Sequence, residues 1–311
     1  MRKAFVSTLV ELAAQDSRIV LLTGDLGFMA LEPFAEKFPE RFFNVGVAEQ
    51  NMVGIATGMA EAGFIPYVYS IDPFAVLRPY EFIRNGPIHH QLPVRIIGVG
   101  GGFEYGHQGI SHYGLEDIGV LRVQPGITII VPADAPQTAT AIRKTWDLPG
   151  PVFYRLGKNT KTVIPRLEGR FKIGSLQVIR EGQDLLFIAM GAIASEVAAV
   201  TTTLHAQGIN CGMAVIASIS PPPTDDLVDL LKRFNTVVTV ETHYIVGGIG
   251  SLASEVIAEH GLACRVIRCG VKTNVGGITG SQSYLEDLRG LSAKALAETA
   301  LHVLGKKKHS S

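Results

Sequence analysis

RFFNVGVAEQNMVGIATGMA, residues 41–60, is the most informative segment of the chain. A short strand is expected to end at Gly46 and a helix to begin near Glu49, which places the Glu49 carboxylate at the helix N-terminus. For an arbitrary glutamate in this position, the ordinary interpretation is an acid that complements the helix dipole. One surface of the helix carries only small residues, Gly54, Ala56, Gly58 and Ala60. Such a surface allows another backbone to approach closely, as at a tight subunit interface.

Strand and helix patterns alternate through the first half of the chain. Short apolar runs rich in β-branched residues occur at residues 19–22, 65–69, 94–97, 127–131 and 152–154. Several of these runs are apolar on both faces, which favours a parallel sheet covered by helices on each side. Between Gly157 and Gly174 the pattern gives way to polar sequence without periodicity, as expected for a connection between domains.

A second alternation of the same kind follows this connection. Further strands are expected at residues 185–189, 213–216, 236–240 and 264–267. The predicted fold class is therefore α/β with two domains. The first is a parallel-sheet domain at residues 1–160, a linker covers residues 161–174, and a smaller α/β domain covers residues 175–311.

The composition limits the range of functions. Of the 311 residues, 47% are hydrophobic and 18% are charged, which indicates apolar surface covered by another subunit. The formal net charge is zero, so the basic face that binds nucleic acid is missing. The three cysteines lack metal-ligand spacing, no apolar run is long enough to span a bilayer, and the first residues form no signal peptide. We therefore expect a cytoplasmic oligomer that binds neither nucleic acid nor a membrane.

Residues 41–60 closely resemble the glutamate motif of the transketolase superfamily, which includes deoxyxylulose-phosphate synthase and the β subunits of 2-oxo acid dehydrogenases. The resemblance implies that Glu49 is catalytic and binds the cofactor thiamine diphosphate. In the family, the matching glutamate hydrogen-bonds the aminopyrimidine ring and promotes removal of the proton from the thiazolium carbon. It also implies that residues 1–160 form the pyrimidine-binding domain and residues 175–311 form a transketolase C-terminal-like domain.

Two further segments resemble the cofactor-binding parts of the family pattern. Thr23-Gly24-Asp25-Leu26 follows the first strand, where the family places an acid at the cofactor-bearing interface, so Asp25 is implied to bind the cofactor. Residues 70–85 resemble the aromatic segment that packs on the aminopyrimidine, and Phe74 falls on its central position. Without the resemblance, a simple turn and a core phenylalanine would be the ordinary interpretations.

Residues 106–122 resemble the family's substrate loop and the helix that follows it. His112 matches the histidine that faces the substrate, where an imidazole moves protons at neutral pH. Gln108 replaces the family acid that contacts the ketose hydroxyls and lies next to an unusual His107, so both are implied to bind substrate in an altered way. Arg155 matches an arginine that holds the terminal phosphate of the substrate.

One half of the family's cofactor site has no counterpart in the sequence. The superfamily holds the diphosphate and Mg²⁺ with a Gly-Asp-Gly motif followed by an asparagine, and Gly24-Asp25-Leu26 lacks the second glycine. The chain thus resembles the C-terminal subunit of a split two-chain transketolase that has no metal ligands of its own. The resemblance implies an N-terminal-type partner subunit that carries the motif and holds Mg²⁺, in a heterotetramer of two plus two.

The resemblance predicts transfer of a two-carbon ketol unit from a ketose with an anionic end, such as phosphate, to an aldose acceptor. Three alternatives stay open: a β subunit of a 2-oxo acid dehydrogenase, a carboligase like deoxyxylulose-phosphate synthase, and a non-catalytic regulatory paralogue. His243 is most simply a solvated loop residue, although it lies where it could face the entrance of the site.

Overall fold

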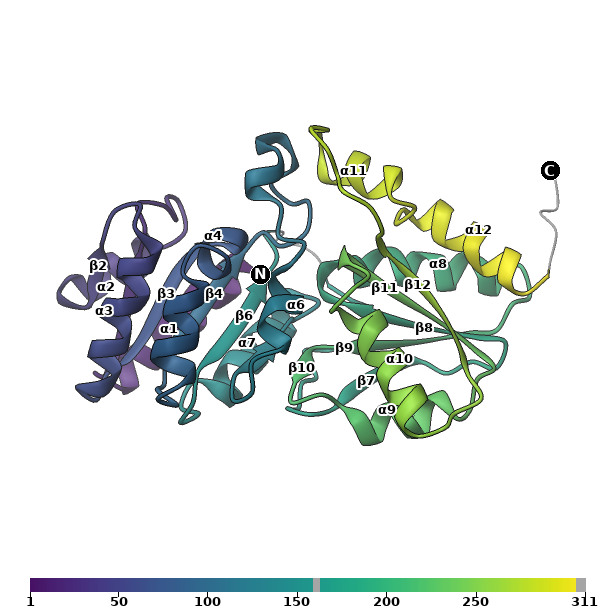
Figure 1. Cartoon of the computed structure of the whole chain (residues 1–311), viewed down its shortest axis with the longest axis horizontal. Helices are drawn as coiled ribbons and strands as arrows, with labels where there is room; N and C mark the ends of the chain where they lie inside the picture. Colours follow the sequence, from purple (N-terminus) through teal and green to yellow (C-terminus); the bar gives the residue numbers. More distant parts are fainter. Residues whose placement is uncertain (159–162, 306–311) are drawn as a thin grey trace.

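The computed structural model describes residues 1–158 and 163–305, which form two α/β lobes (Figure 1). The first sheet has the strand order β10-β5-β6-β4-β3-β1-β2, and the second has the order β12-β11-β8-β9-β7. Neighbouring strands run parallel except for β10 against β5 and β7 against β9. The predicted fold class is confirmed. The boundary predicted after residue 160 lies outside the described residues, as does the end of the chain from residue 306.

The strands are β1 (Ile19–Thr23), β2 (Phe42–Asn44), β3 (Ile65–Ile71), β4 (Arg95–Val99), β5 (Thr128–Ile130), β6 (Val152–Leu156), β7 (Leu176–Arg180), β8 (Leu185–Met190), β9 (Cys211–Ile216), β10 (Ser218–Ser220), β11 (Thr236–Tyr244) and β12 (Arg265–Val271). The helices are α1 (Arg2–Gln15), α2 (Glu32–Lys37), α3 (Glu49–Glu61), α4 (Asp72–Val76), α5 (Tyr80–Ile83), α6 (Asp117–Arg122), α7 (Ala135–Thr145), α8 (Ala194–Ala206), α9 (Thr224–Leu231), α10 (Ile249–Glu259), α11 (Gln282–Leu288) and α12 (Ala293–Val303). Shorter helical turns are η1 (Pro39–Arg41), η2 (Arg84–Ile88), η3 (Gly106–Gln108), η4 (Ile110–His112) and η5 (Gly191–Ile193).

Helices cover both faces of the first sheet, as the two-sided apolar strands predicted. Phe5 and Leu9 of α1 and Ile142 of α7 pack on one face, while Met52 and Val53 of α3 pack on the other. Every residue of β1, β4 and β6 is buried. These strands therefore form a rigid base for the loops at their carboxyl ends, where ligands bind in parallel α/β sheets.

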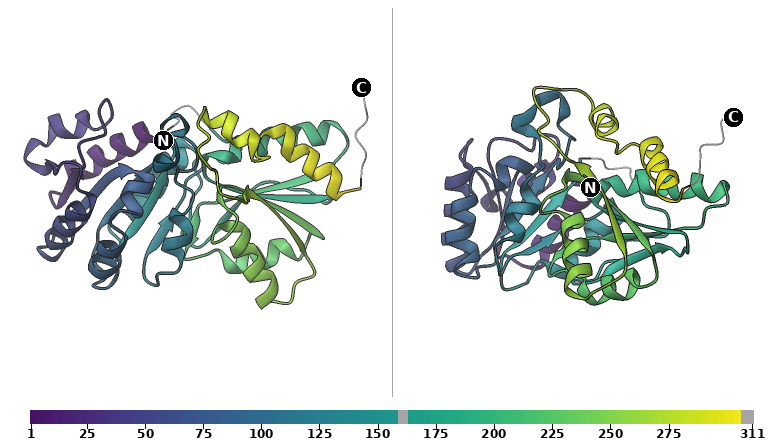
Figure 2. Two further views of the ribbon diagram at one scale, coloured as in Figure 1. Left: turned by 45° about the horizontal axis from the view of Figure 1, so that its top comes forward. Right: turned by 45° about the vertical axis from the view of Figure 1, so that its right-hand side comes forward.

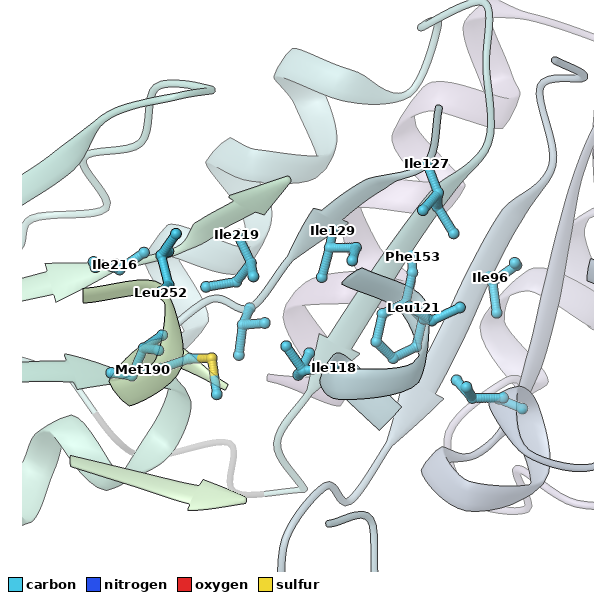
Figure 3. Close-up of a cluster of buried hydrophobic side chains, with 14 of the residues drawn as sticks. Ile96, Ile118, Leu121, Ile127, Ile129, Phe153, Met190, Ile216, Ile219 and Leu252 are labelled. Atoms are coloured by element: carbon cyan, nitrogen blue, oxygen red, sulfur yellow. The ribbon is translucent and has the colours of Figure 1, made fainter. Parts of the chain in front are cut away.

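The two lobes share one hydrophobic core (Figure 3). A single cluster runs from Ile118 and Phe153 in the first lobe to Met190 and Leu252 in the second. The strand β10 comes from the second half of the chain but pairs with β5 in the first sheet. The lobes lie side by side in both views of Figure 2. Their relative position is thus set by an apolar core and a shared sheet edge, and this position matters for the site.

The described part of the predicted linker, residues 163–174, is packed against the protein. Ile164, Leu167 and Phe171 are almost fully buried in the hydrophobic clusters. The Ile164 N–H donates to the Asp134 carboxylate over 2.9 Å. The sequence concealed this role because the apolar residues of the segment are scattered among polar ones without a regular period.

Candidate active site

Glu49 is the first residue of α3 and is 1% exposed. Its carboxylate accepts hydrogen bonds of 3.0 Å from Ser70 Oγ and of 3.0 Å from Arg78 Nη1. The turn that leads into α3 contains Gly46 with φ of 75°, a left-handed conformation that glycine adopts without strain. A side chain at Gly24 would lie only 3.2 Å from the Gly46 carbonyl oxygen. The two glycines therefore allow β1 and the α3 turn to approach closely around the glutamate.

Phe74 and His112 lie beside each other next to this glutamate. Phe74 belongs to α4, which follows directly from β3, and its ring is half-buried. The His112 ring lies 4.9 Å from the Phe74 ring, measured between centroids, in an edge-on arrangement of 67°. The Arg78 guanidinium covers the Phe74 ring at 3.7 Å and connects it to Glu49. The structure thus brings together the predicted carboxylate, aromatic face and imidazole.

His112 ends the short turn η4, and its ring Nδ1 lies 3.0 Å from Ser111 Oγ. Burial and then the positive charge of Arg78 lower the pKa of His112 below its ordinary value. A lowered pKa favours the neutral ring, which can accept a proton at neutral pH. His107 and Gln108 are exposed on the preceding turn η3, on the solvent side of the same loop.

Asp25 lies at the carboxyl end of β1, one residue from the glycine that packs on Glu49. Its backbone has φ of 56°, and its carboxylate accepts a 3.0 Å hydrogen bond from Asn44 Nδ2. The Asn44 side chain in turn accepts from the Asp25 N–H over 2.9 Å. This reciprocal pair fixes an exposed acid on the rim of the site, apart from the buried cluster.

Arg155 lies deeper than its predicted role requires. Its guanidinium is buried, forms an ion pair of 2.9 Å with Asp117, and donates to the carbonyl oxygens of Gly114 at 2.6 Å and Thr242 at 3.0 Å. The structure does not place it beside His112, and its donors face partners within the protein. A role in holding the substrate phosphate stays a prediction that requires the guanidinium to leave these partners.

His243 is buried between the lobes, so the interpretation as a solvated loop residue is wrong. It is 0% exposed on β11, and its ring Nδ1 lies 2.6 Å from the Tyr244 carbonyl oxygen. Its Nε2 accepts a 3.2 Å hydrogen bond from the Gly119 N–H of α6. The neighbouring residues gave no sign of this burial, because α6 and not the local sequence covers the ring.

Arg78 is the site residue that the sequence interpretation missed. It follows Phe74 by four residues, a spacing that places two side chains on one side of a helical segment. That spacing was the feature of the sequence from which a contact between Arg78 and Phe74 could have been predicted. Its contacts with Glu49 and Phe74 mean that one positive charge touches two predicted cofactor-binding residues.

The side chains present fit the aminopyrimidine end of thiamine diphosphate. A buried carboxylate can accept a hydrogen bond from a ring N–H, and an aromatic face can pack on a flat heterocycle. In residues 1–158 and 163–305, no group of three or more His, Cys, Asp or Glu side chains could hold a metal ion.

The comparisons with known proteins agree with this geometry. Residues 1–162 match the model of the transketolase pyrimidine binding domain, and residues 174–296 match that of the transketolase C-terminal domain. The chain belongs to the transketolase family. A putative transketolase C-terminal section from Methanocaldococcus jannaschii is 36% identical, with 98% of this chain and 96% of that protein covered.

Two other similar proteins match this chain along nearly their whole length. An apulose-4-phosphate transketolase subunit from Phocaeicola vulgatus is 33% identical, with 98% of this chain and 97% of that protein covered. A solved structure described as a split gene transketolase in an inactive β4 tetramer is 34% identical, has a TM-score of 0.88, and covers 99% of both chains. The resemblance to the C-terminal subunit of a split transketolase is thereby confirmed.

Among the described residues, no helix is long and apolar enough to cross a membrane.

Proposed function

We propose that the chain is the catalytic C-terminal subunit of a two-chain transketolase that transfers a two-carbon ketol unit from a ketose to an aldose acceptor. The observation that carries this proposal is the buried Glu49 carboxylate with Phe74 and His112 beside it. A scaffold protein has no need of a buried carboxylate near a half-buried aromatic ring and an imidazole, because a buried carboxylate is costly.

Each side chain has a distinct task in this proposal. Glu49 and Phe74 hold the aminopyrimidine, Glu49 by accepting a hydrogen bond and Phe74 by stacking, and Asp25 lines the cofactor site at its rim. When bound, thiamine diphosphate supplies the carbon nucleophile that attacks the ketose carbonyl. His112, neutral because of its lowered pKa, takes up or returns a proton at a substrate hydroxyl.

The loop of His107 and Gln108 is proposed to select the substrate. Both side chains are exposed next to His112, where they can hydrogen-bond sugar hydroxyls. The far end of the ketose is proposed to be anionic, with phosphate as the first choice. The relative from Phocaeicola vulgatus, whose name includes a sugar phosphate, supports this choice.

The partner is proposed to be an N-terminal-type subunit that carries the Gly-Asp-Gly motif, binds Mg²⁺ and the diphosphate, and assembles two plus two. Three large apolar residues near the site support an interface there: Phe28 is 71% exposed, Met29 95% and Val47 71%. Gly54 and Gly58 on the exposed side of α3 leave room for a close approach. The related β4 tetramer, described as inactive, supports the need for a second kind of subunit.

Calorimetry with thiamine diphosphate and Mg²⁺ tests the shared site. We expect no binding to this chain alone and binding to its mixture with a diphosphate-side subunit. Tight binding by the isolated chain would mean that it holds the diphosphate itself, contrary to the proposal. In the mixture, Glu49→Gln should abolish ketol transfer and slow deuterium exchange at the thiazolium carbon.

The matched control is Glu61→Gln, which removes an exposed charge at the other end of α3 and should leave both rates unchanged. Unchanged activity of Glu49→Gln would favour the regulatory paralogue. Acylation of a lipoyl domain by the mixture would favour the 2-oxo acid dehydrogenase alternative. Condensation of pyruvate with an aldose phosphate would favour a synthase-like carboligase.

A further inference from the structure

Asp72 is a fully buried acid directly beneath the candidate site. It is the first residue of α4, two residues before Phe74, and is 0% exposed. Among the described residues, neither of its carboxyl oxygens accepts a hydrogen bond from an ordinary donor group. Burying a carboxylate without hydrogen-bond donors costs free energy of folding, so the surroundings of Asp72 should offset this cost.

Two glycines form a cradle around this carboxyl group. A side chain at Gly98 of β4 would lie 2.4 Å from Asp72 Oδ1, and one at Gly114 would lie 1.9 Å from Oδ2. Gly114 ends the loop that carries His112, and its backbone bridges to Gly102 through hydrogen bonds of 2.7 and 3.1 Å. The Asp72 carboxyl group therefore packs directly on the backbone that positions the His112 loop.

The charges around Asp72 are unequal in number. Asp117, also 0% exposed in its side chain, is paired with Arg155 at 2.9 Å, whereas Asp72 Oδ2 is 4.0 Å from the same guanidinium. Burial and then the negative charge of Asp117 raise the pKa of Asp72 well above its ordinary value, and the more distant Glu104 acts in the same direction. Arg155 opposes this rise. Arg155 lies close to both aspartates but nearer to Asp117, so within the described residues Asp72 is the acid without a close cation.

We propose that Asp72 is a positioning residue that remains a neutral carboxylic acid and shares its proton with the Asp117 carboxylate. The shared proton joins α4, which carries Phe74, to α6. Arg155 extends the connection to the Thr242 carbonyl of β11 in the second lobe. The inference depends on the proposed function only in that Phe74 and His112 are the side chains being positioned.

Thermal unfolding of the full chain between pH 5 and 9 tests the shared proton. Above the ordinary aspartate pKa, folded wild type retains a proton that the unfolded chain has released, so its stability falls as pH rises toward the raised pKa. Asp72→Asn mimics the neutral acid and should lack the part of this fall that Asp72 causes. The buried Glu241 and Glu286, whose pKa values are raised to about 7, contribute to the fall in both proteins. The melting temperature of Asp72→Asn relative to wild type should therefore rise with pH.

Asp117→Asn should lower the melting temperature at every pH, because it removes the buried 2.9 Å ion pair with Arg155. Asp229→Asn, an exposed acid on α9, is the matched control and should follow wild type. A melting temperature of Asp72→Asn that is lower than wild type by the same amount at all pH values would show that Asp72 is ionised. That outcome would overturn the proposal.

NMR resonances of the His112 ring test the positioning role. Their loss in the His112→Gln variant assigns them. Asp72→Leu should shift the ring resonances and their pH titration, and Asp72→Asn should restore both to wild-type values. Unchanged His112 resonances in a folded Asp72→Leu variant would rule out the positioning role. These measurements need neither cofactor nor partner. A negative result here would therefore not contradict the proposed ketol transfer. Likewise, a negative calorimetric result would not contradict the role of Asp72.

Discussion

His243 should make the contact between the two lobes sensitive to pH. The ring is fully buried, and only the neutral form with hydrogen on Nδ1 satisfies both of its contacts. Nδ1 then donates to the Tyr244 carbonyl, and Nε2 accepts from the Gly119 N–H. Protonation would place a second donor on Nε2, facing another donor, and would break the hydrogen bond between β11 and α6.

The size of the effect follows from proton linkage. Burial lowers the pKa of His243 below its ordinary value of 6.5. Below pH 6.5 the histidine binds a proton in the unfolded chain but not in the folded chain, so the free energy of unfolding falls as pH falls. The slope approaches about 1.4 kcal/mol per pH unit until the lowered pKa is reached. Above pH 6.5 the contribution of His243 is complete and independent of pH.

Urea denaturation of the full chain at pH 5, 6, 7 and 8 would measure this slope. His243→Gln keeps an acceptor for Gly119 but cannot titrate, so we expect it to be about 1 kcal/mol less stable at pH 8 and to lose less stability between pH 6.5 and 5. His260→Gln, an exposed histidine at the end of α10, is the control and should follow wild type. Parallel curves for wild type and His243→Gln would refute the reasoning.

Three further predictions concern the same region. Arg78→Gln removes a positive charge that lowers the pKa of His112, so an NMR titration should show that pKa moving up. Gly114→Ala would place a methyl group 1.9 Å from Asp72 Oδ2 and should cost about 1–3 kcal/mol in urea denaturation. Arg122 forms a 2.6 Å ion pair with the half-exposed Glu255 across the lobes and donates to the Gly247 carbonyl over 2.9 Å, so Arg122→Ala should cost about 1–3 kcal/mol by the same measurement, mostly through the hydrogen bond.

The sheets were predictable from the sequence because most of their strands are short apolar runs that can be recognised locally. The run at residues 65–69 is apolar on both faces and forms the first five residues of β3, and α3 begins at the predicted Glu49. The strand β10 was not predicted. It has only three residues, and it pairs with β5 across about ninety positions of sequence, a contact that no local pattern encodes.

The candidate site was predictable to a similar extent. The motif resemblance selected Glu49, Phe74 and His112, and the fold brings these three together. It also selected Arg155, whose surroundings depend on Asp72 and Asp117, two acids that reach it from other elements. The local sequence around an arginine at the end of a strand is the same whether the side chain faces substrate or a buried carboxylate. The burial of Arg155 is therefore visible only in the packed structure.

The second lobe contributes to the site mainly through backbone groups, which explains why its role is hidden in the sequence. The Tyr113 hydroxyl, next to His112, donates to the Ile278 carbonyl over 2.6 Å, and the Gly280 N–H donates to the Gly106 carbonyl over 3.2 Å. Arg155 reaches the Thr242 carbonyl in the same way. Carbonyl and amide groups are present at nearly every position, so side-chain identity does not reveal which of them are used. The position of the His112 loop therefore depends on how the two lobes pack, and this packing also sets the surroundings of Asp72 and His243.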